Sequence, residues 1–309
     1  MADKIATRAS YGKALIELGA ENPNIVVLDA DLSGSTQTKK FADAFPERFF
    51  NAGIAECNMM GMAAGLAVAG KTVFASTFAM FAAGRAYEII RNSIGYTGAN
   101  VKICATHAGL TVGEDGASHQ CVEDIALMRV IPGMTVINPA DDVSARKLIK
   151  AAAAFRGPCY IRLGRAAVPV LYDEDRDIEI GKALKLREGR DAAILATGIM
   201  VSEALKAAEM LAAEGIEVKV FDIHTIKPID EAAIIEAAGT GAIVSAEEHS
   251  VLGGMGSAVA ELLARKAPCK MRMIGVRDSF GESGKPAELL EKYHLTARDI
   301  AEAVRELKV

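Results

Sequence analysis

Residues 51–70 read NAGIAECNMMGMAAGLAVAG, a stretch of almost only small and apolar residues with one acid, Glu56, near its start. The run 54–68 has the length and composition of a helix, and Gly61 and Gly65 would let another backbone approach it closely. In one interpretation, Glu56 lies in the first turn and is stabilised there by the helix dipole. In the other, it is a buried acid that needs a partner, such as a ring nitrogen to which it hydrogen-bonds.

Outward from this stretch, short β-branched runs alternate with longer helix-periodic runs. Strands are expected at 25–28, 72–75, 101–105, 135–137 and 159–162, and helices at 11–19, 55–68, 82–94, 122–128 and 142–153. Apolar strands separated by helices predict a parallel sheet covered on both faces. Ligands bind beyond the carboxyl ends of such strands, so segments 29–36, 76–81 and 106–120 are expected on one functional edge.

A charged stretch near the middle of the chain predicts a boundary between two α/β domains. We expect a first domain over residues 1–175, a solvated linker over 176–190 and a smaller domain over 191–309. Strands of the smaller domain are expected at 192–196, 217–221, 242–245 and 272–274, and helices at 201–213, 231–238, 256–264, 286–292 and 297–307. Each domain is predicted to be a mostly parallel sheet covered by helices.

Composition narrows the classes of function. A formal net charge of −5 over 309 residues gives no reason to expect a nucleic acid or an anionic membrane as partner. The start, MADKIATRAS, lacks the apolar region of a secretory signal, and the apolar run 59–69 is too short to span a bilayer. Five scattered cysteines without a C-x-x-C pair indicate a reduced, cytoplasmic chain.

The loop 106–120, THAGLTVGEDGASHQ, is the segment richest in candidate chemistry. It follows a strand, and long glycine-rich loops in such positions commonly carry sites. His107, Asp115 and His119 match no standard zinc spacing, so they are better suited to hydrogen bonds and proton transfers with a polyhydroxylated substrate. Glu114-Asp115-Gly116 with Asn138 only loosely resembles a GDG…N magnesium and diphosphate motif, because the first glycine is absent, and we do not assign a metal there.

Arginines and phenylalanines near the expected sheet edge leave two interpretations each. Arg8, Arg162 and Arg165 could bind phosphate, for which arginine is well suited, or could form ordinary ion pairs. Phe78 and Phe81 could be core aromatics or the wall on which a planar ring stacks.

The order of several segments identifies a family resemblance. NAGIAE, STFAMF, THAGLTVGEDGASHQ, VIPGMTVINPAD and IRLGR closely resemble the pyrimidine-binding domain of transketolase, as do IATRAS and DADLSGS. FDIHTIKPID and EEHSVLGGMGSAVAELL are similar to the transketolase C-terminal domain. The resemblance covers nearly the whole chain, and its most specific part is GEDGASHQ together with Glu56.

The resemblance implies that this chain binds the pyrimidine end of thiamine diphosphate. Glu56 aligns with the glutamate that hydrogen-bonds the aminopyrimidine N1′ and so promotes removal of the thiazolium C2 proton. Phe78 and Phe81 match the aromatics that hold the pyrimidine ring, and Asp31 and Leu32 match residues near the cofactor.

The resemblance also implies a substrate site for sugar phosphates. His119 matches the histidine beside the reacting carbon and is a candidate proton carrier, while His107 and Asp115 match sugar-hydroxyl ligands. The residues that match the grip on the phosphate end are Arg8, Ser35 and Arg165.

Two departures from the family bear on function. Gly84 stands where many transketolases have a tyrosine, and the family's diphosphate-binding domain has no counterpart in this sequence. The resemblance therefore implies the C-terminal half of a split transketolase, active only with a partner that carries the GDG…N motif and binds Mg²⁺, in a heterotetramer of two plus two chains.

Three alternatives to a transketolase subunit remain open. One is a related split enzyme, similar to 1-deoxyxylulose-5-phosphate synthase or acting on an unusual sugar. The β subunit of 2-oxo acid dehydrogenase E1 shares the architecture but lacks the double-histidine loop. The last is a non-catalytic stabilising subunit, which the joint presence of Glu56, His107, Asp115, His119 and Arg165 disfavours.

Overall fold

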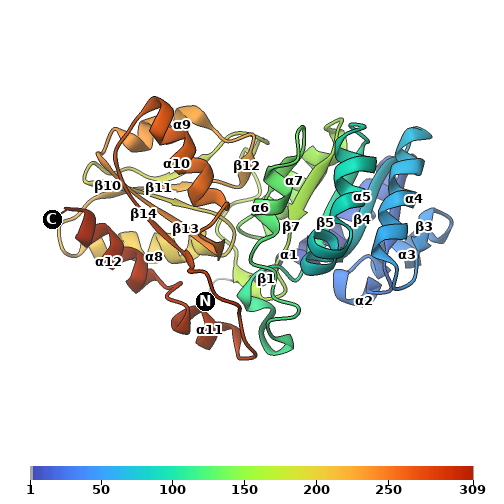
Figure 1. Ribbon diagram of the computed structural model, residues 1–309, viewed down its shortest axis with the longest axis horizontal. Helices are drawn as coiled ribbons and strands as arrows, with labels where there is room; N and C mark the ends of the chain where they lie inside the picture. The colour runs from blue at the N-terminus through green and yellow to red at the C-terminus, as the bar shows by residue number, and fades with distance from the viewer. Residues whose placement is uncertain (1–2, 309) are drawn as a thin grey trace.

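The computed structural model describes residues 3–308 and shows two α/β lobes side by side (Figure 1). The lobe drawn in blue to green contains the first half of the chain, and the yellow to red lobe contains the second. Strand β1 (Lys4–Ala6) lies at the junction of the lobes and helix α12 (Ala297–Lys308) at the far end of the second lobe. The prediction of two α/β domains is confirmed.

The first lobe is built on a sheet that has seven strands within residues 3–308, in the order β12-β6-β7-β5-β4-β2-β3. The pairs among β2 to β7 are parallel, and most of these strands are buried throughout because helices cover both faces. Its own strands are β2 (Ile25–Asp29), β3 (Phe49–Asn51), β4 (Thr72–Phe78), β5 (Val101–Thr106), β6 (Thr135–Ile137) and β7 (Cys159–Arg162). Its helices are α1 (Thr7–Glu21), α2 (Ser33–Thr36), α3 (Lys39–Ala44), η1 (Pro46–Arg48), α4 (Glu56–Val68), η2 (Phe81–Arg85), α5 (Tyr87–Ile89), η3 (Ile90–Gly95), η4 (Leu110–Asp115), α6 (Asp124–Arg129) and α7 (Asp142–Ala154).

The second lobe is built on a sheet whose order is β14-β13-β10-β11-β9. In Figure 1, α9 (Glu231–Ala238) and α10 (Met255–Lys266) cover one face, and α8 (Met200–Ala212) and α12 (Ala297–Lys308) cover the other. The strands are β9 (Leu184–Arg187), β10 (Ala192–Ala196), β11 (Val218–Asp222), β13 (Ala242–Ser250) and β14 (Lys270–Val276). Helix α11 (Pro286–Lys292) lies at the junction, beside η4 of the first lobe.

Short strands tie the two lobes and the connection together in ways that the sequence pattern does not reveal. Strand β12 (Thr225–Lys227) follows β11 but pairs antiparallel with β6 of the first sheet. Residues 184–187, expected in the linker, form β9 and pair with β11. Strands β1 (Lys4–Ala6) and β8 (Ala167–Pro169) pair with each other. These four short strands lie at sheet edges or in a two-stranded pair, where burial imposes no continuous apolar run, so the partner strand rather than local propensity selects them.

The helix expected over 82–94 is wound as π turns on either side of a short α turn. The backbone N–H of Ala86 donates to Phe81 O at 3.3 Å, and that of Tyr96 donates to Arg91 O at 2.9 Å, both five residues apart. A hydrophobic period of 3.6 cannot reveal such turns, which are often found at functional sites.

Helix α4 packs one face on the first sheet and leaves the other face open. Met59, Met60 and Ala63 are fully buried, whereas Ile54, just before the helix, and Val68, its last residue, are 77% and 79% exposed. Within residues 3–308, no atom outside the helix's own backbone lies within 4 Å of a Cβ built at Gly61 or Gly65. Although α4 is apolar, no helix within residues 3–308 is long and apolar enough to cross a membrane.

Candidate active site

The carboxyl ends of three neighbouring strands bring the predicted site segments together. Strand β4 pairs in parallel with β2 on one side and β5 on the other. Segments 29–36, 76–81 and 106–120 therefore leave the sheet along the same edge, as the sequence predicts. Helix α4, which begins at Glu56, packs against β4 beside them.

Glu56 is both the first residue of α4 and a buried acid with a partner. Its side chain is 5% exposed, and Oε1 accepts a hydrogen bond from Nη1 of Arg85 at 3.1 Å. Arg85 is 55% exposed, and its guanidinium lies over the Phe81 ring, 4.5 Å from the centroid. The sequence analysis missed Arg85. The available signal was its position as the one basic residue between Lys71 and Arg91, four residues after Phe81.

Aromatic rings gather beside this ion pair. Phe78 and Phe81 stack with their centroids 5.6 Å apart and their planes at 15°. The His107 ring lies 3.8 Å from that of Phe78, and His119 meets the edges of both phenylalanines at 6.2 and 5.4 Å. Phe78 is buried, whereas Phe81 is half-buried and is the ring that Arg85 covers. The two phenylalanines form a stacked apolar pair, and Arg85 links this pair to the Glu56 carboxylate.

The two histidines have different environments. His107 is 3% exposed, has a left-handed backbone with φ of 57°, and shares a hydrogen bond between Nδ1 and Thr106 Oγ1 at 2.9 Å. Burial, followed by the positive charges of Arg8 and Arg165, lowers the pKa of His107 to about 3. His107 is therefore neutral at physiological pH and suited to hydrogen bonding rather than proton transfer. His119 is half-buried, and its Nδ1 shares a hydrogen bond with Ser118 Oγ at 2.9 Å.

The residues expected to grip phosphate lie close to these histidines. Nη1 of Arg8 donates to the backbone oxygen of Ser35 at 2.7 Å. Nη1 of Arg165 donates to Val112 O at 2.6 Å and to the Glu114 carboxylate at 2.9 Å. Burial and the charge of Arg165 lower the pKa of Arg8, so the two guanidiniums lie within electrostatic range of each other.

Arg162, the third arginine singled out from the sequence, has a different environment. It is 4% exposed, and its Nε donates to Asp124 at 2.9 Å. This buried ion pair engages Arg162 inside the protein, at the contact between the lobes.

The DADLSGS segment is held by Asp29 rather than by the residues predicted to approach the cofactor. Asp29 is buried and accepts hydrogen bonds from Leu32 N at 2.6 Å, Thr36 Oγ1 at 2.7 Å and Thr38 Oγ1 at 2.9 Å. Asp31 is exposed with a left-handed φ of 63°, and its Oδ1 accepts a hydrogen bond from the side-chain amide of Asn51 at 3.1 Å. This arrangement fixes the loop beside the cluster.

Asp115 and Gly84 lie at the exposed rim. Asp115 ends the η4 turn, and its carboxylate makes no hydrogen bond within the described part of the chain. Gly84 is exposed, and a side chain there would first meet the flexible end of Met80, at 2.3 Å from Cε. No group of three or more His, Cys, Asp or Glu residues between positions 3 and 308 is arranged to hold a metal ion.

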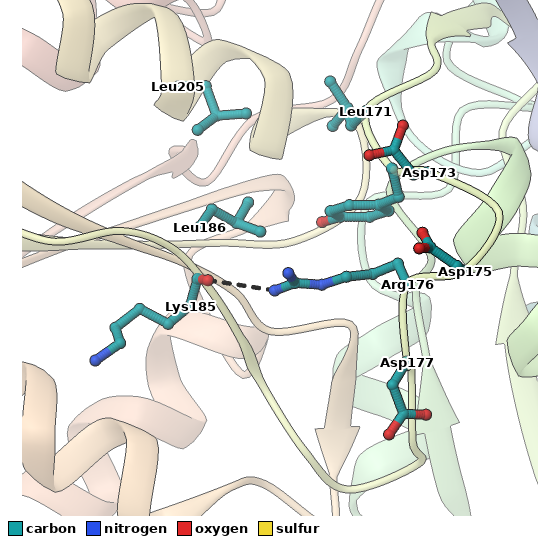
Figure 2. Close-up of a pocket in the computed structure, with 9 residues that line it drawn as sticks. Leu171, Asp173, Asp175, Arg176, Asp177, Lys185, Leu186 and Leu205 are labelled. Atoms are coloured by element: carbon teal, nitrogen blue, oxygen red, sulfur yellow. Dashed lines mark hydrogen bonds between the residues drawn. The ribbon is translucent and has the colours of Figure 1, made fainter.

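A separate hollow of about 480 Å³ lies between the connection and the second lobe (Figure 2). In Figure 2, Arg176 reaches towards the backbone oxygen of Lys185, to which its Nη2 donates at 3.4 Å. Acidic side chains of the connection, Asp173, Asp175 and Asp177, line the hollow. None of the residues predicted for the active site lines it, so it is a different feature of the surface.

Comparisons with known proteins identify the family of this chain. The family model of the transketolase pyrimidine-binding domain matches residues 3–170, and that of the transketolase C-terminal domain matches residues 181–300. The chain belongs to the transketolase family. It is 53% identical over 302 residues to a putative transketolase C-terminal section of Methanocaldococcus jannaschii, covering 97% of this chain and 95% of that one. It is 38% identical over 310 residues to human transketolase, covering 99% of this chain and 49% of the human protein.

Solved structures give the same result. A split gene transketolase described as an inactive beta4 tetramer superposes with a TM-score of 0.93 at 59% identity, covering 98% of each chain. Transketolase from Campylobacter jejuni shares the fold with a TM-score of 0.86 at 24% identity, over 99% of this chain and 47% of that one. This transketolase-family chain thus corresponds to nearly all of a split-gene chain and to about half of single-chain relatives.

A transketolase pyrimidine-binding domain implies thiamine diphosphate, and the residues present fit one end of that cofactor. The partly exposed face of Phe81 suits a planar aminopyrimidine, and the adjoining Glu56 carboxylate suits a ring nitrogen. Both groups contact one cation, Arg85, so they lie within reach of a single guanidinium.

Proposed function

We propose that this chain is the pyrimidine-binding subunit of a split transketolase. With a partner chain, it transfers a two-carbon ketol unit from a ketose phosphate to an aldose phosphate. The observation that carries the proposal is the convergence of Glu56, Phe81, His107 and His119 at one sheet edge, with Arg8 and Arg165 nearby. Residues 1–175 would bind the cofactor and substrate, and residues 191–309 would support them.

Glu56 and the phenylalanines would hold the pyrimidine end of the cofactor. Phe81 presents a ring face for stacking, and Glu56 hydrogen-bonds N1′ of the aminopyrimidine. When bound, thiamine diphosphate supplies the nucleophilic carbon. Asp31 and Leu32 shape the neighbouring loop, which Asp29 holds in place. Because Glu56 is buried, its hydrogen bond is little screened by water.

The histidines and arginines would bind the sugar phosphate. His119 is half-buried at the rim of the cluster and can carry a proton to or from the substrate hydroxyl. His107, neutral because burial lowers its pKa to about 3, would hydrogen-bond a sugar hydroxyl together with Asp115. Arg8 and Arg165, with Ser35, would hold the phosphate end by charge-assisted hydrogen bonds.

A partner chain would complete the site. The partner would carry the GDG…N motif and bind Mg²⁺ and the diphosphate, in an assembly of two plus two chains. The open face of α4 has no neighbour at Gly61 or Gly65 among the described residues, and it is flanked by the exposed Ile54, just before the helix, and Val68, at its end. Such a chain could cover this surface. The similar split-gene transketolase, described as an inactive beta4 tetramer, supports the idea that this half alone is inactive.

The sugar itself is open to a second candidate. One relative, 45% identical and from a Clostridium species, is named as part of a 6-deoxy-6-sulfo-D-fructose transketolase. Another, 38% identical and from Phocaeicola vulgatus, is named as part of an apulose-4-phosphate transketolase. These names favour ketol transfer from an unusual sugar by the same site.

A cytoplasmic location is supported by the cysteines, since all five, which lie within the described residues, are free thiols.

The test is reconstitution. The purified chain, a GDG…N partner, Mg²⁺ and thiamine diphosphate should together give ketol transfer that neither chain gives alone. In the assembly, Glu56→Gln should abolish rapid exchange of the cofactor's C2 proton, measured by NMR in deuterated water, because the carboxylate acts before every turnover. Near wild-type exchange in Glu56→Gln would contradict the role of Glu56. Activity from the isolated chain, in material shown by mass spectrometry to lack a partner, would contradict the split enzyme.

A further inference from the structure

The second lobe touches the active-site loop through a buried carboxylate. Oε1 of Glu248, near the end of β13, accepts a hydrogen bond from the backbone N–H of Thr111 at 2.6 Å. Glu248 is 4% exposed. Gly109, with a φ of 81°, lies so close that a side chain there would sit 2.3 Å from Cδ of Glu248. The loop backbone at Gly109 and Thr111 therefore packs directly against this carboxylate.

Arg162 fixes the backbone that carries Glu248. Nη2 of Arg162 donates to the backbone oxygen of Glu248 at 2.9 Å, while Nε donates to Asp124 at 2.9 Å. The backbone N–H of Ser250 donates to Val122 O at 2.7 Å, two residues further along β13. Arg162 and Asp124 are both buried and hydrogen-bonded, so they hold the Glu248 backbone in place. Glu248 therefore presents its carboxylate in one orientation.

A second contact holds the other end of the loop. Nε2 of Gln120 donates to the backbone oxygens of Leu110 at 3.1 Å and Gly113 at 3.2 Å, and to that of Glu282 in the second lobe at 2.9 Å. The loop that carries His107 and His119 is thus hydrogen-bonded to the second lobe at two places, through Glu248 and through Glu282.

We propose that Glu248 is a positioning residue: by holding the N–H of Thr111, it places His107 and His119 for the sugar substrate. The statement about the sugar rests on the proposed function, whereas the effect on the loop does not. In this arrangement the second lobe contributes to the reaction through the shape of the loop, and the cofactor residues Glu56 and Phe81 make no hydrogen bond to Glu248 within the described residues.

The loop can be tested in the isolated chain by amide hydrogen exchange. Glu248→Ala should raise the exchange rate of the Thr111 amide by about tenfold or more, because the N–H loses a charge-assisted bond. Glu248→Gln should raise it less, since the amide oxygen still accepts. Glu203→Ala is the matched control, because Glu203 accepts from Ala297 N at 3.0 Å in the same lobe, away from the loop. Unchanged Thr111 exchange in both Glu248 variants, or an equal rise in Glu203→Ala, would overturn the proposal.

The consequence for substrate is tested in the reconstituted enzyme. Glu248→Ala should raise KM and lower kcat/KM for ketol transfer by about tenfold or more, while exchange of the cofactor's C2 proton stays at the wild-type rate. Glu248→Gln should recover most of the loss. If ketol transfer and proton exchange fall together, in proportion to the folded fraction, Glu248 is only structural and the proposal is wrong. If the wild-type assembly transfers no ketol unit, the proposed function fails, and the hydrogen-exchange result still decides whether Glu248 holds the loop.

Discussion

Replacement of Arg85 tests whether the Arg85 side chain must leave Glu56 before the cofactor binds. Arg85 occupies both groups that the pyrimidine would use, pairing with Glu56 at 3.1 Å and covering Phe81 at 4.5 Å. These contacts must break for Glu56 to bond N1′ and for Phe81 to stack on the ring. When only a fraction of the protein is in the binding-competent state, the apparent affinity is reduced in proportion to that fraction. Arg85→Ala should therefore tighten cofactor binding.

The magnitude follows from the exposure of Arg85. An ion pair whose cation is 55% exposed is worth about 0.5–1 kcal/mol, and an exposed cation–π contact about the same. Their sum, about 1–2 kcal/mol, corresponds to an apparent Kd lower by about 5- to 30-fold. The unpaired Glu56 carboxylate of the variant adds to the effect, because it gains more from a new partner.

The assay is calorimetric titration of thiamine diphosphate into the reconstituted enzyme at fixed Mg²⁺. Arg91→Ala is the matched control, since Arg91 is exposed on the same helical segment and its Nη1 donates only to Asn92 within the described chain. Arg85→Lys should fall between wild type and Arg85→Ala, because lysine keeps the charge without the planar guanidinium. Weaker cofactor binding in Arg85→Ala would refute the reasoning and show that Arg85 contacts the bound cofactor.

Three further changes probe the substrate site and the lobe contact. His119→Ala should lower kcat/KM for ketol transfer by ~10²–10⁴-fold with cofactor affinity unchanged; a collapse of that affinity would place His119 in the cofactor site. Arg165→Ala should raise KM by about 10- to 100-fold for phosphorylated sugars but not for unphosphorylated analogues, through loss of a charge-assisted contact; equal effects would contradict the phosphate role. Burial raises the pKa of Asp222, whose carboxylate accepts from Tyr172, to about 8. The free energy of unfolding of the wild type should therefore fall relative to that of Asp222→Asn as pH rises from about 4 through 8. Urea unfolding midpoints of the two proteins that change in parallel over this pH range would contradict the prediction.

The regular elements could be predicted from the sequence because burial gives them a local pattern. The runs 135–137, 159–162, 192–196 and 231–238 coincide with β6, β7, β10 and α9. The central strands are buried along nearly their whole length, and are rich in apolar residues, because helices cover both faces of a parallel sheet. The functional edge followed from the same reasoning, since it depends only on strand direction.

The contacts inside the site could not be predicted, because they join residues far apart in sequence. Glu56 and Arg85 are 29 positions apart, and Glu248 and Thr111 are 137 apart. The family resemblance pointed to Glu56 but carries no information on which cation neutralises it. The π turn that ends at Arg85 also lies outside any helical period, so the position of that side chain follows only from the three-dimensional structure.

The junction shows why the lobes cannot be treated as independent domains. Strand β12 belongs to the second lobe in sequence but completes the edge of the first sheet beside β6. Arg162 and Glu248 are each 4% exposed, and they meet across the junction. Separating the lobes would remove β12 from the sheet, take the Glu248 backbone oxygen from Arg162 and take the Thr111 N–H from the Glu248 carboxylate. A buried polar group left without its hydrogen bond costs about 1–3 kcal/mol. The active-site loop lies at this junction, so its geometry depends on the folding of both lobes together.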